Sequence, residues 1–211
     1  MALNNNPTPN EVVKGIKTLE HDKMDKTNPT GTGSFSLNRK LNTPVGSYSF
    51  AEGYQTEARG DYGSHAEGTG TSSNGGYGSH AEGSNTQASG QASHAEGYLT
   101  SASGQASHAE GTLTKASGEN SHCEGQDTIA TGMNQHVSGK YNIEDTEDKY
   151  AEIIGNGTPD TARSNARTLD WNGNEYLAGN LQASGLTDGT TTKTMSEILA
   201  GGGMKLWRYE D

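Results

Sequence analysis

The sequence predicts an all-β protein, a parallel β-solenoid whose short coils associate as a homotrimer. Two observations predict the solenoid: a phrase that returns every 14 or 15 residues, and a glycine at the end of each phrase. A third observation, the low hydrophobic content, predicts that subunits associate. Hydrophobic residues make up 28% of the 211, and there are two Phe and two Trp. Such a chain buries too little apolar surface to offset its ordering entropy alone. It is therefore either disordered or shares its core between subunits, and the repeats favour the shared core.

The repeat is the pentapeptide Ser-His-Ala-Glu-Gly. Full copies occur at 64–68, 79–83, 93–97 and 107–111, a copy with Cys123 in place of Ala at 121–125, and degenerate copies at 49–53 and 135–139. The His position falls at 50, 65, 80, 94, 108, 122 and 136. Between the pentapeptides runs a second phrase, Thr-x-Ala-Ser-Gly, as at Thr100–Gly104. Seven copies in register are a strong repeat signal.

A period of 14 to 15 residues suits one solenoid coil made of two short strands and two tight turns. Helical-pair repeats and propeller blades need longer units. Each glycine marks a turn, at positive φ or where two backbones approach closely. Stacked coils repeat at about 4.8 Å, so about seven coils over residues 44–140 would form a rod about 30–35 Å long.

The alternation within the pentapeptide assigns its side chains to two faces. His and Glu, two residues apart, face one side, while Ala and the flanking Ser and Gly face the narrow interior of the coil. Because a thin coil has little core of its own, we expect the His and Glu face to pack against two copies of itself around a three-fold axis. The residues of this predicted axis are His65, Glu67, His80, Glu82, His94, Glu96, His108, Glu110, His122 and Glu124.

The His column has three interpretations. In the first, His and Glu satisfy each other across the interface and fix the register and the trimeric state. In the second, neutral imidazoles coordinate a divalent metal, three per three-fold rung. In the third, protonation below pH about 6 loosens or tightens the trimer. The candidate metal ligands are His65, His80, His94, His108, His122 and His136.

The Ser-x-Ala-x-Gly phrase and the 14-residue step resemble the head repeats of trimeric autotransporter adhesins. That resemblance implies a left-handed parallel β-roll assembled as a trimer, with aliphatic residues where this chain has His and Glu. The polar Ser-His-Ala-Glu-Gly version is more similar to tail- and head-fibre proteins of phages and prophages of Gram-positive bacteria. The resemblance covers about residues 44–140. It implies a structural virion fibre that attaches the particle to a glycan or protein on the host cell surface.

Residues 1–43 are predicted to form a short helix and a linker. Apolar residues lie at helical spacing within 11–26, and Asn28-Pro29 ends the pattern. The resemblance to fibre proteins implies that this end contacts the other structural proteins of the particle. No residue of this segment is the basis for that orientation.

Residues 141–181 are predicted to form a β-rich region that locks the trimer. Thr168–Leu177 indicates a β-hairpin with an Asn172-Gly173 turn. The stretch from Ile154 to Trp171 resembles the lead-in to the self-cleaving region of phage pre-neck appendage proteins, whose C-terminal chaperone assists trimerisation and then cuts itself off. Too few residues follow here for such a chaperone. Self-cleavage is therefore kept as an alternative function.

Residues 182–211 form a tail with an aromatic, partly basic end. Trp207, Arg208 and Tyr209 are the candidate receptor tip, because Trp and Tyr stack on sugars and anchor interfaces. The alternative is a last strand that packs against the end of the trimer.

Composition excludes several partners. A formal net charge of −11 disfavours nucleic acid and anionic lipid, and no apolar stretch approaches the ~20 residues that span a bilayer. Residues 1–7 lack the features of a signal peptide, so we expect synthesis in the host cytoplasm. Cys123 is the sole cysteine, which excludes an intrachain disulfide and suggests a small buried filler.

Enzymatic functions have little support in the sequence. His and Glu recur once per coil, as lattice residues do, and there is no nucleophile elbow, phosphate-binding glycine loop or zinc-protease motif. We therefore expect no catalytic residue and no cofactor beyond the metal considered above. A bacterial trimeric surface adhesin is the other alternative function, whereas a hexapeptide-repeat acyltransferase would need a six-residue period that is missing.

Overall fold

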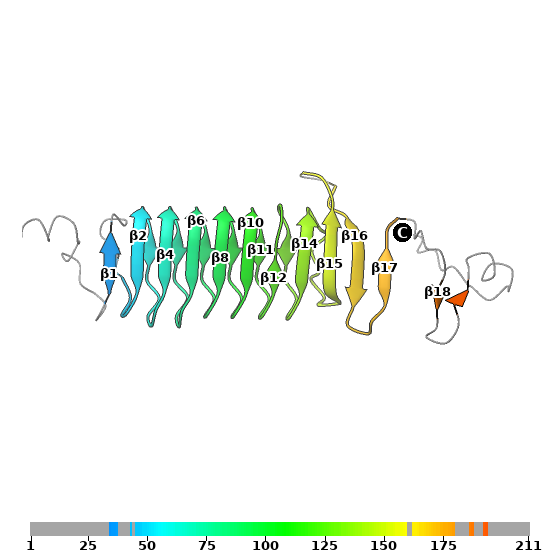
Figure 1. The fold of residues 1–211 in the computed structure, drawn as a ribbon, viewed down its shortest axis with the longest axis horizontal. Coiled ribbons are helices and arrows are strands. Elements are labelled where there is room, and N and C mark those ends of the chain that lie inside the picture. Colours follow the sequence, from blue (N-terminus) through cyan, green and yellow to red (C-terminus); the bar gives the residue numbers. More distant parts are fainter. Residues whose placement is uncertain are drawn as a thin grey trace, which may run out of the picture. The chain divides into compact units, whose positions relative to one another are not determined.

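The computed structural model describes residues 34–37, 43, 45–159, 162–179, 186–187 and 192–193. The predicted fold class is confirmed: the chain is an all-β parallel solenoid of about eight turns, and the described residues contain no helix. Figure 1 shows the strands stacked side by side. The predicted helix within 11–26 lies outside the described residues, and the trimer and the hand of the coil remain predictions. Contacts divide the chain into residues 1–176 and 177–211.

Two sheets form the first unit. The long-strand sheet contains, in order, β1 (Phe35–Leu37), β2 (Phe50–Tyr54), β4 (His65–Thr69), β6 (His80–Ser84), β8 (His94–Tyr98), β10 (His108–Thr112), β12 (His122–Cys123), β14 (His136–Lys140), β15 (Tyr150–Asn156), β16 (Asn165–Asp170) and β17 (Glu175–Leu177). The short-strand sheet contains β3 (Glu57–Ala58), β5 (Ser72–Ser73), β7 (Gln87–Ala88), β9 (Ser101–Ala102), β11 (Lys115–Ala116) and β13 (Ile129–Ala130). In the second unit, β18 (Leu186–Thr187) pairs antiparallel with β19 (Thr192–Lys193).

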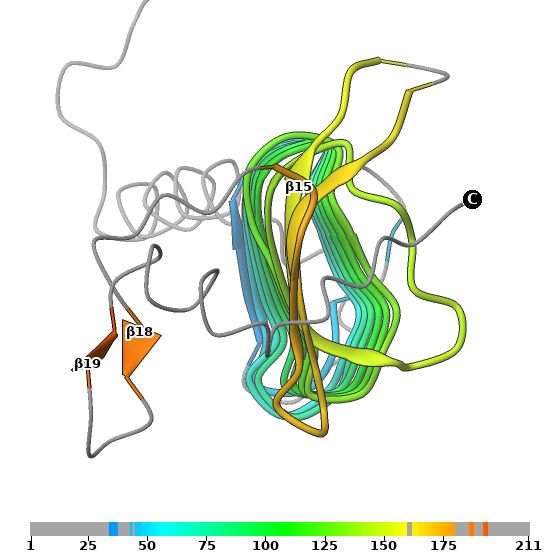
Figure 2. The same cartoon turned by 90° about the vertical axis from the view of Figure 1, so that its right-hand side faces the viewer.

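Successive coils stack with equivalent residues in register. His80 pairs with His94 and His94 with His108, and the neighbouring Ala, Glu and Gly positions follow the same register. Viewed along the stack, the coils lie over one another (Figure 2). Each coil therefore contacts its neighbours through the same atoms, and one phrase of sequence specifies one rung of the ladder.

Small residues line the interior, as predicted. Ala95 and Ala109 of the long strands and Ala102 and Ala116 of the short strands are fully buried. Cys123 takes the Ala position in its own coil and is a buried free thiol, whose pKa burial raises. Among the described residues, larger aliphatic side chains are buried at the two ends of the solenoid: Val45 at one end, and Val137 and Ile153 at the other.

A column of threonines fills one corner of the interior. Its members are Thr56, Thr71, Thr86, Thr100, Thr114 and Thr128, all buried. The hydroxyl of Thr128 donates to the carbonyl oxygen of Glu124 at 2.9 Å and contacts Cys123 Sγ at 3.0 Å. The other five hydroxyls are buried and have no hydrogen-bond partner in the described parts of the chain.

This difference predicts opposite effects for the same substitution. Thr114→Val removes an unsatisfied hydroxyl at nearly constant shape, so the free energy of unfolding should rise by about 1 kcal/mol. Thr128→Val removes the hydrogen bond to Glu124 O and should lower the free energy of unfolding by about 1 kcal/mol. Urea unfolding followed by circular dichroism measures both. Shifts of the same sign would contradict the assignment.

The turns place residues other than glycine in the left-handed region. Leu99 has φ 56° and Ala106 has φ 53°, and equivalent residues of the other coils share this conformation. It directs each N–H along the stack: Leu99 N–H donates to Ser84 O at 2.9 Å and Ala106 N–H to Gln91 O at 2.8 Å. These hydrogen bonds offset the cost of a positive φ in a residue with a side chain.

The two 15-residue coils accommodate their extra residue in one of these turns. Tyr62 and Gly63 have φ of 61° and 89°, and Tyr77 and Gly78 have φ of 57° and 83°. A second consecutive residue in the left-handed region suits glycine. The insertion therefore leaves the strands on either side in register.

The C-terminal end of the ladder is closed by antiparallel strands. β15 pairs in parallel with β14, so the sheet crosses the predicted boundary at residue 140. β16 then pairs antiparallel with β15, and β17 follows β16. The predicted Asn-Gly hairpin is confirmed in β16–β17: Gly173 has φ 83°, and the Asp170 carboxylate accepts hydrogen bonds from the backbone N–H groups of Asn172 and Asn174. We call β16 and β17 the antiparallel cap.

Candidate functional site

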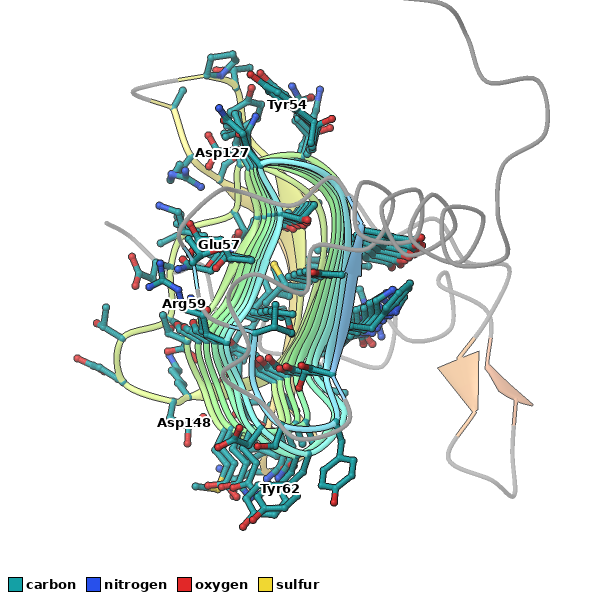
Figure 3. The ribbon with its side chains drawn as sticks, turned by 90° about the vertical axis from the view of Figure 1, so that its left-hand side faces the viewer. Tyr54, Glu57, Arg59, Tyr62, Asp127 and Asp148 are labelled. Atoms are coloured by element: carbon teal, nitrogen blue, oxygen red, sulfur yellow. The ribbon has the colours of Figure 1, made fainter. Side chains whose placement is uncertain are left out.

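The outer surface of the long-strand sheet carries the predicted His and Glu columns. We call this surface the His–Glu face. It comprises His65, His80, His94, His108, His122 and His136 with Glu52, Glu67, Glu82, Glu96, Glu110 and Glu124. Figure 3, which views the solenoid along its stack, shows side chains of successive coils overlapping in columns, with Tyr54 and Asp127 at one turn and Tyr62 and Asp148 at the other. All ten residues of the predicted axis therefore lie together on one face.

The imidazoles form a continuous stack. Neighbouring ring centroids lie 4.6–4.9 Å apart from His65 to His136, with interplanar angles of 2–21°. Phe50 occupies the His position of the preceding coil and lies 5.0 Å from the His65 ring. Burial, followed by the charges of the neighbouring imidazoles, lowers the pKa of His80 and of His108. Both effects favour the neutral form of the His80 and His108 rings.

Each imidazole lies beside carboxylates of its own coil or the preceding one. His80 Nε2 is 3.7 Å from Glu67 Oε1 and 3.9 Å from Glu82 Oε2. His122 Nε2 is 3.7 Å from Glu110 Oε1, and His136 Nε2 is 3.6 Å from Glu124 Oε1. These distances exceed those of direct hydrogen bonds. All six Nε2 atoms are buried and have no hydrogen-bond partner among the residues that the structure describes.

The Glu column shares protons between coils. Because Glu96 hydrogen bonds with Glu82 and Glu110, and because burial and their negative charge disfavour its ionised form, its pKa is raised to about 7. The same hydrogen bonds from Glu96 lower the pKa of Glu82 and of Glu110. Near neutral pH, Glu96 therefore donates a proton between two ionised neighbours.

This arrangement predicts a pH-dependent effect of Glu96→Gln. The pKa of Glu96 rises on folding from 4.5 to about 7, so its stabilising contribution is present below pH 4.5 and is lost as the pH rises from 4.5 to 7. At pH 8, Gln keeps an N–H donor without the charge and should raise the melting temperature by about 2–4 °C. At pH 4.5 the two proteins should melt alike.

Thermal unfolding in chelator-containing buffer at both pH values measures the effect. The control is Glu119→Gln, which changes an exposed turn residue outside the His–Glu face. A stabilisation by Glu96→Gln that is equal at pH 4.5 and pH 8 would argue against a shared proton.

Glutamate and glycine line an open groove along the same face. Its volume is about 860 Å³, and its walls are Glu52, Gly53, Glu67, Gly68, Glu82, Gly83, Glu96, Gly97, Glu110, Gly111, Glu124 and Gly125. Each of these glycines follows its Glu and has a positive φ, as at Gly97 with φ 107°. A Cβ at Gly97 would overlap the backbone of Gly111, so the close stacking of the coils excludes a side chain at these positions.

A second surface was not predicted from the sequence. Tyr48, Tyr62 and Tyr77 lie at the same turn of three successive coils, all exposed and all at positive φ, and the rings of Tyr62 and Tyr77 stack at 5.2 Å. The spacing of 14 and 15 residues between them was the signal that could have identified this column. The candidate tip, Trp207, Arg208 and Tyr209, lies outside the described residues.

Comparison with known proteins leaves the chain without an assigned family. No protein-family profile, no curated protein and no solved structure matches it. Over the ranges that the structure describes, no helix is long and apolar enough to cross a membrane.

Proposed function

We propose that this chain is a structural subunit of a homotrimeric fibre that attaches a phage or phage-like particle to its host cell surface. The observation that supports the trimer is the His–Glu face, where imidazoles and carboxylates of successive coils, each about a third exposed, form two columns along one side of the solenoid. Two further copies, packed on this face around a three-fold axis, would bury the exposed parts of both columns and pair their polar groups.

A structural role, rather than catalysis, accounts for the repetition of the site. The same His and Glu pair returns in each coil with the same neighbours, as His80 with Glu82 and His94 with Glu96. A catalytic centre needs one such arrangement, whereas an interface that extends along the solenoid needs it in every coil. The resemblance of the repeats to phage fibre proteins supports the proposal that the chain belongs to a phage or phage-like particle. Three identical distal ends would add weak contacts to a repetitive cell surface through avidity.

The mass in solution tests the trimer. Multi-angle light scattering of the purified chain should give about three times 22.1 kDa. The double variant Glu96→Arg/Glu110→Arg places bulk and positive charge on the His–Glu face, so it should not form the trimer and its mass should fall to that of one chain. Glu119→Arg at an exposed turn is the control and should remain trimeric. A parent mass of one chain would overturn the trimer.

The location of the protein tests the proposal that it forms a fibre on a particle. Gold-labelled antibody against the chain should decorate projections of particles released from the source strain, and labelled protein should bind host cells. Label on the bacterial envelope without any particle would favour the surface-adhesin alternative. A purified chain shortened at its C-terminus would favour the self-cleaving one.

A further inference from the structure

We propose that the His–Glu face binds divalent transition-metal ions at sites formed within one chain, each by imidazole Nε2 and carboxylate oxygens of one coil and its neighbour. This differs from a site of three histidines contributed by three chains, because every ligand here comes from the same polypeptide. The inference does not depend on the proposed fibre.

The distances on the face are those of ligands to a shared ion. Nε2 and carboxylate oxygens lie 3.6–4.0 Å apart along the column. That is too long for a direct hydrogen bond between nitrogen and oxygen. Two ligand atoms about 2.0–2.2 Å from one tetrahedral ion are about 3.4 Å apart. An ion placed between them would therefore require small side-chain movements and no change in the backbone.

The unpaired nitrogens point to a missing partner. Each of the six Nε2 atoms is buried and has no hydrogen bond to any described residue, although the side chains themselves are about a third exposed. An unprotonated Nε2 is the atom that a metal ion accepts as a ligand.

The charge on the face favours a cation, and the ligand types indicate which one. Six carboxylates line one groove in successive coils, so they repel each other unless protonated or neutralised. Mixed imidazole and carboxylate ligands suit Zn²⁺, Co²⁺, Ni²⁺ or Cu²⁺. Ca²⁺ and Mg²⁺ prefer oxygen ligands alone.

The geometry also limits the number of metal ions that one chain can bind. Four groups of three residues bring one ligand atom each within 4.8 Å of the others. Three of these groups share no residue: Glu52–His65–Glu67, His80–Glu82–His94 and Glu96–His108–Glu110. The fourth, Glu110–His122–Glu124, shares Glu110 with the third. We therefore expect about three ions per chain.

The test counts ions on a tag-free chain that carries His21→Asn, because His21 is the one histidine outside the repeats. The protein is stripped with chelator, dialysed against Zn²⁺ or Co²⁺, and analysed by plasma mass spectrometry. The expected count is about three per chain, with visible absorption bands of tetrahedral or five-coordinate Co²⁺. A count below one ion per chain would overturn the inference.

Variants locate the ions. Glu96→Gln/Glu110→Gln removes the third group and the fourth, so the count should fall by about one ion per chain. His108→Gln/His122→Gln removes the same two groups, should do the same and serves if the Glu double variant does not fold. Glu119→Gln is the matched control and should keep the parent count. An unchanged count in both face variants would overturn the inference.

Mass and metal content measured on the same sample separate the two proposals. Three ions on a monomeric chain would support the metal sites and contradict the trimer. A metal-free trimer would do the reverse.

Discussion

Gly104→Ala should prevent the coils around it from stacking and lower the free energy of unfolding by more than about 3 kcal/mol. A Cβ at this position would lie 2.0 Å from the carbonyl oxygen of Gly118 and 2.6 Å from its carbon. Both are backbone atoms of the next coil, so they cannot move without separating the strands. The hydrogen bonds that Ser103 and Gly104 donate to Ala116 O would be lost with that separation.

Alanine substitutions at two other glycines distinguish the cost of steric overlap from the cost of backbone strain. Gly76 has open space around it and no positive φ, so Gly76→Ala should melt like the parent. Gly63 also has open space but a φ of 89°, so Gly63→Ala should cost about 1–2 kcal/mol through conformation alone. Urea unfolding of the three variants measures the series. Equal losses at Gly76 and Gly104 would show that close stacking is not what excludes a side chain.

Removal of the antiparallel cap should make the chain associate end to end. A chain that ends after Ser164 would leave the outer edge of β15 unpaired, because β16 is its neighbour there. Seven residues of exposed N–H and C=O groups, including those of the buried Ile153, are a template for another strand. In the intact chain, the last strand of this sheet is short: β17 has three residues, and Glu175 pairs with Arg167 at 2.5 Å.

The matched control is a chain that ends after Gly179 and so keeps the cap. Both chains retain Arg163, which binds the Asp127 carboxylate at 2.5 Å and its carbonyl oxygen at 2.8 Å. Size-exclusion chromatography and light scattering should find large assemblies for the shorter chain and a discrete species for the longer one. If the shorter chain stayed discrete, another part of the protein would have to protect the end of the sheet.

The repeats were sufficient to predict the solenoid and its two faces. A period of 14 to 15 residues fixes which residues face each other in successive coils, so the interior position of Ala95 and the columns of His94 and Glu96 follow from the sequence alone. The hairpin at Asn172-Gly173 was predicted for a local reason, because an Asn-Gly pair specifies a tight turn.

Features that depend on neighbouring coils were not predicted. Tyr62, Leu99 and Ala106 adopt a positive φ because it directs their N–H groups to carbonyl oxygens of the preceding coil, a reason that no local propensity contains. The raised pKa of Glu96 likewise depends on the hydrogen bonds with Glu82 and Glu110. The antiparallel pairing of β15 with β16 joins two segments that lack the repeat, so periodicity gave no signal for it.

The identical register of successive coils makes the length of the rod easy to change by recombination. Loss of residues 94–107 would bring His80 against His108 with the same Ala, Glu and Gly neighbours that His80 now meets at His94. Each such deletion or duplication alters the rod by one step of about 4.8 Å and leaves both ends intact. Unequal crossing-over between gene repeats can thus adjust the length of the rod while the contacts of the His, Ala, Glu and Gly positions stay the same.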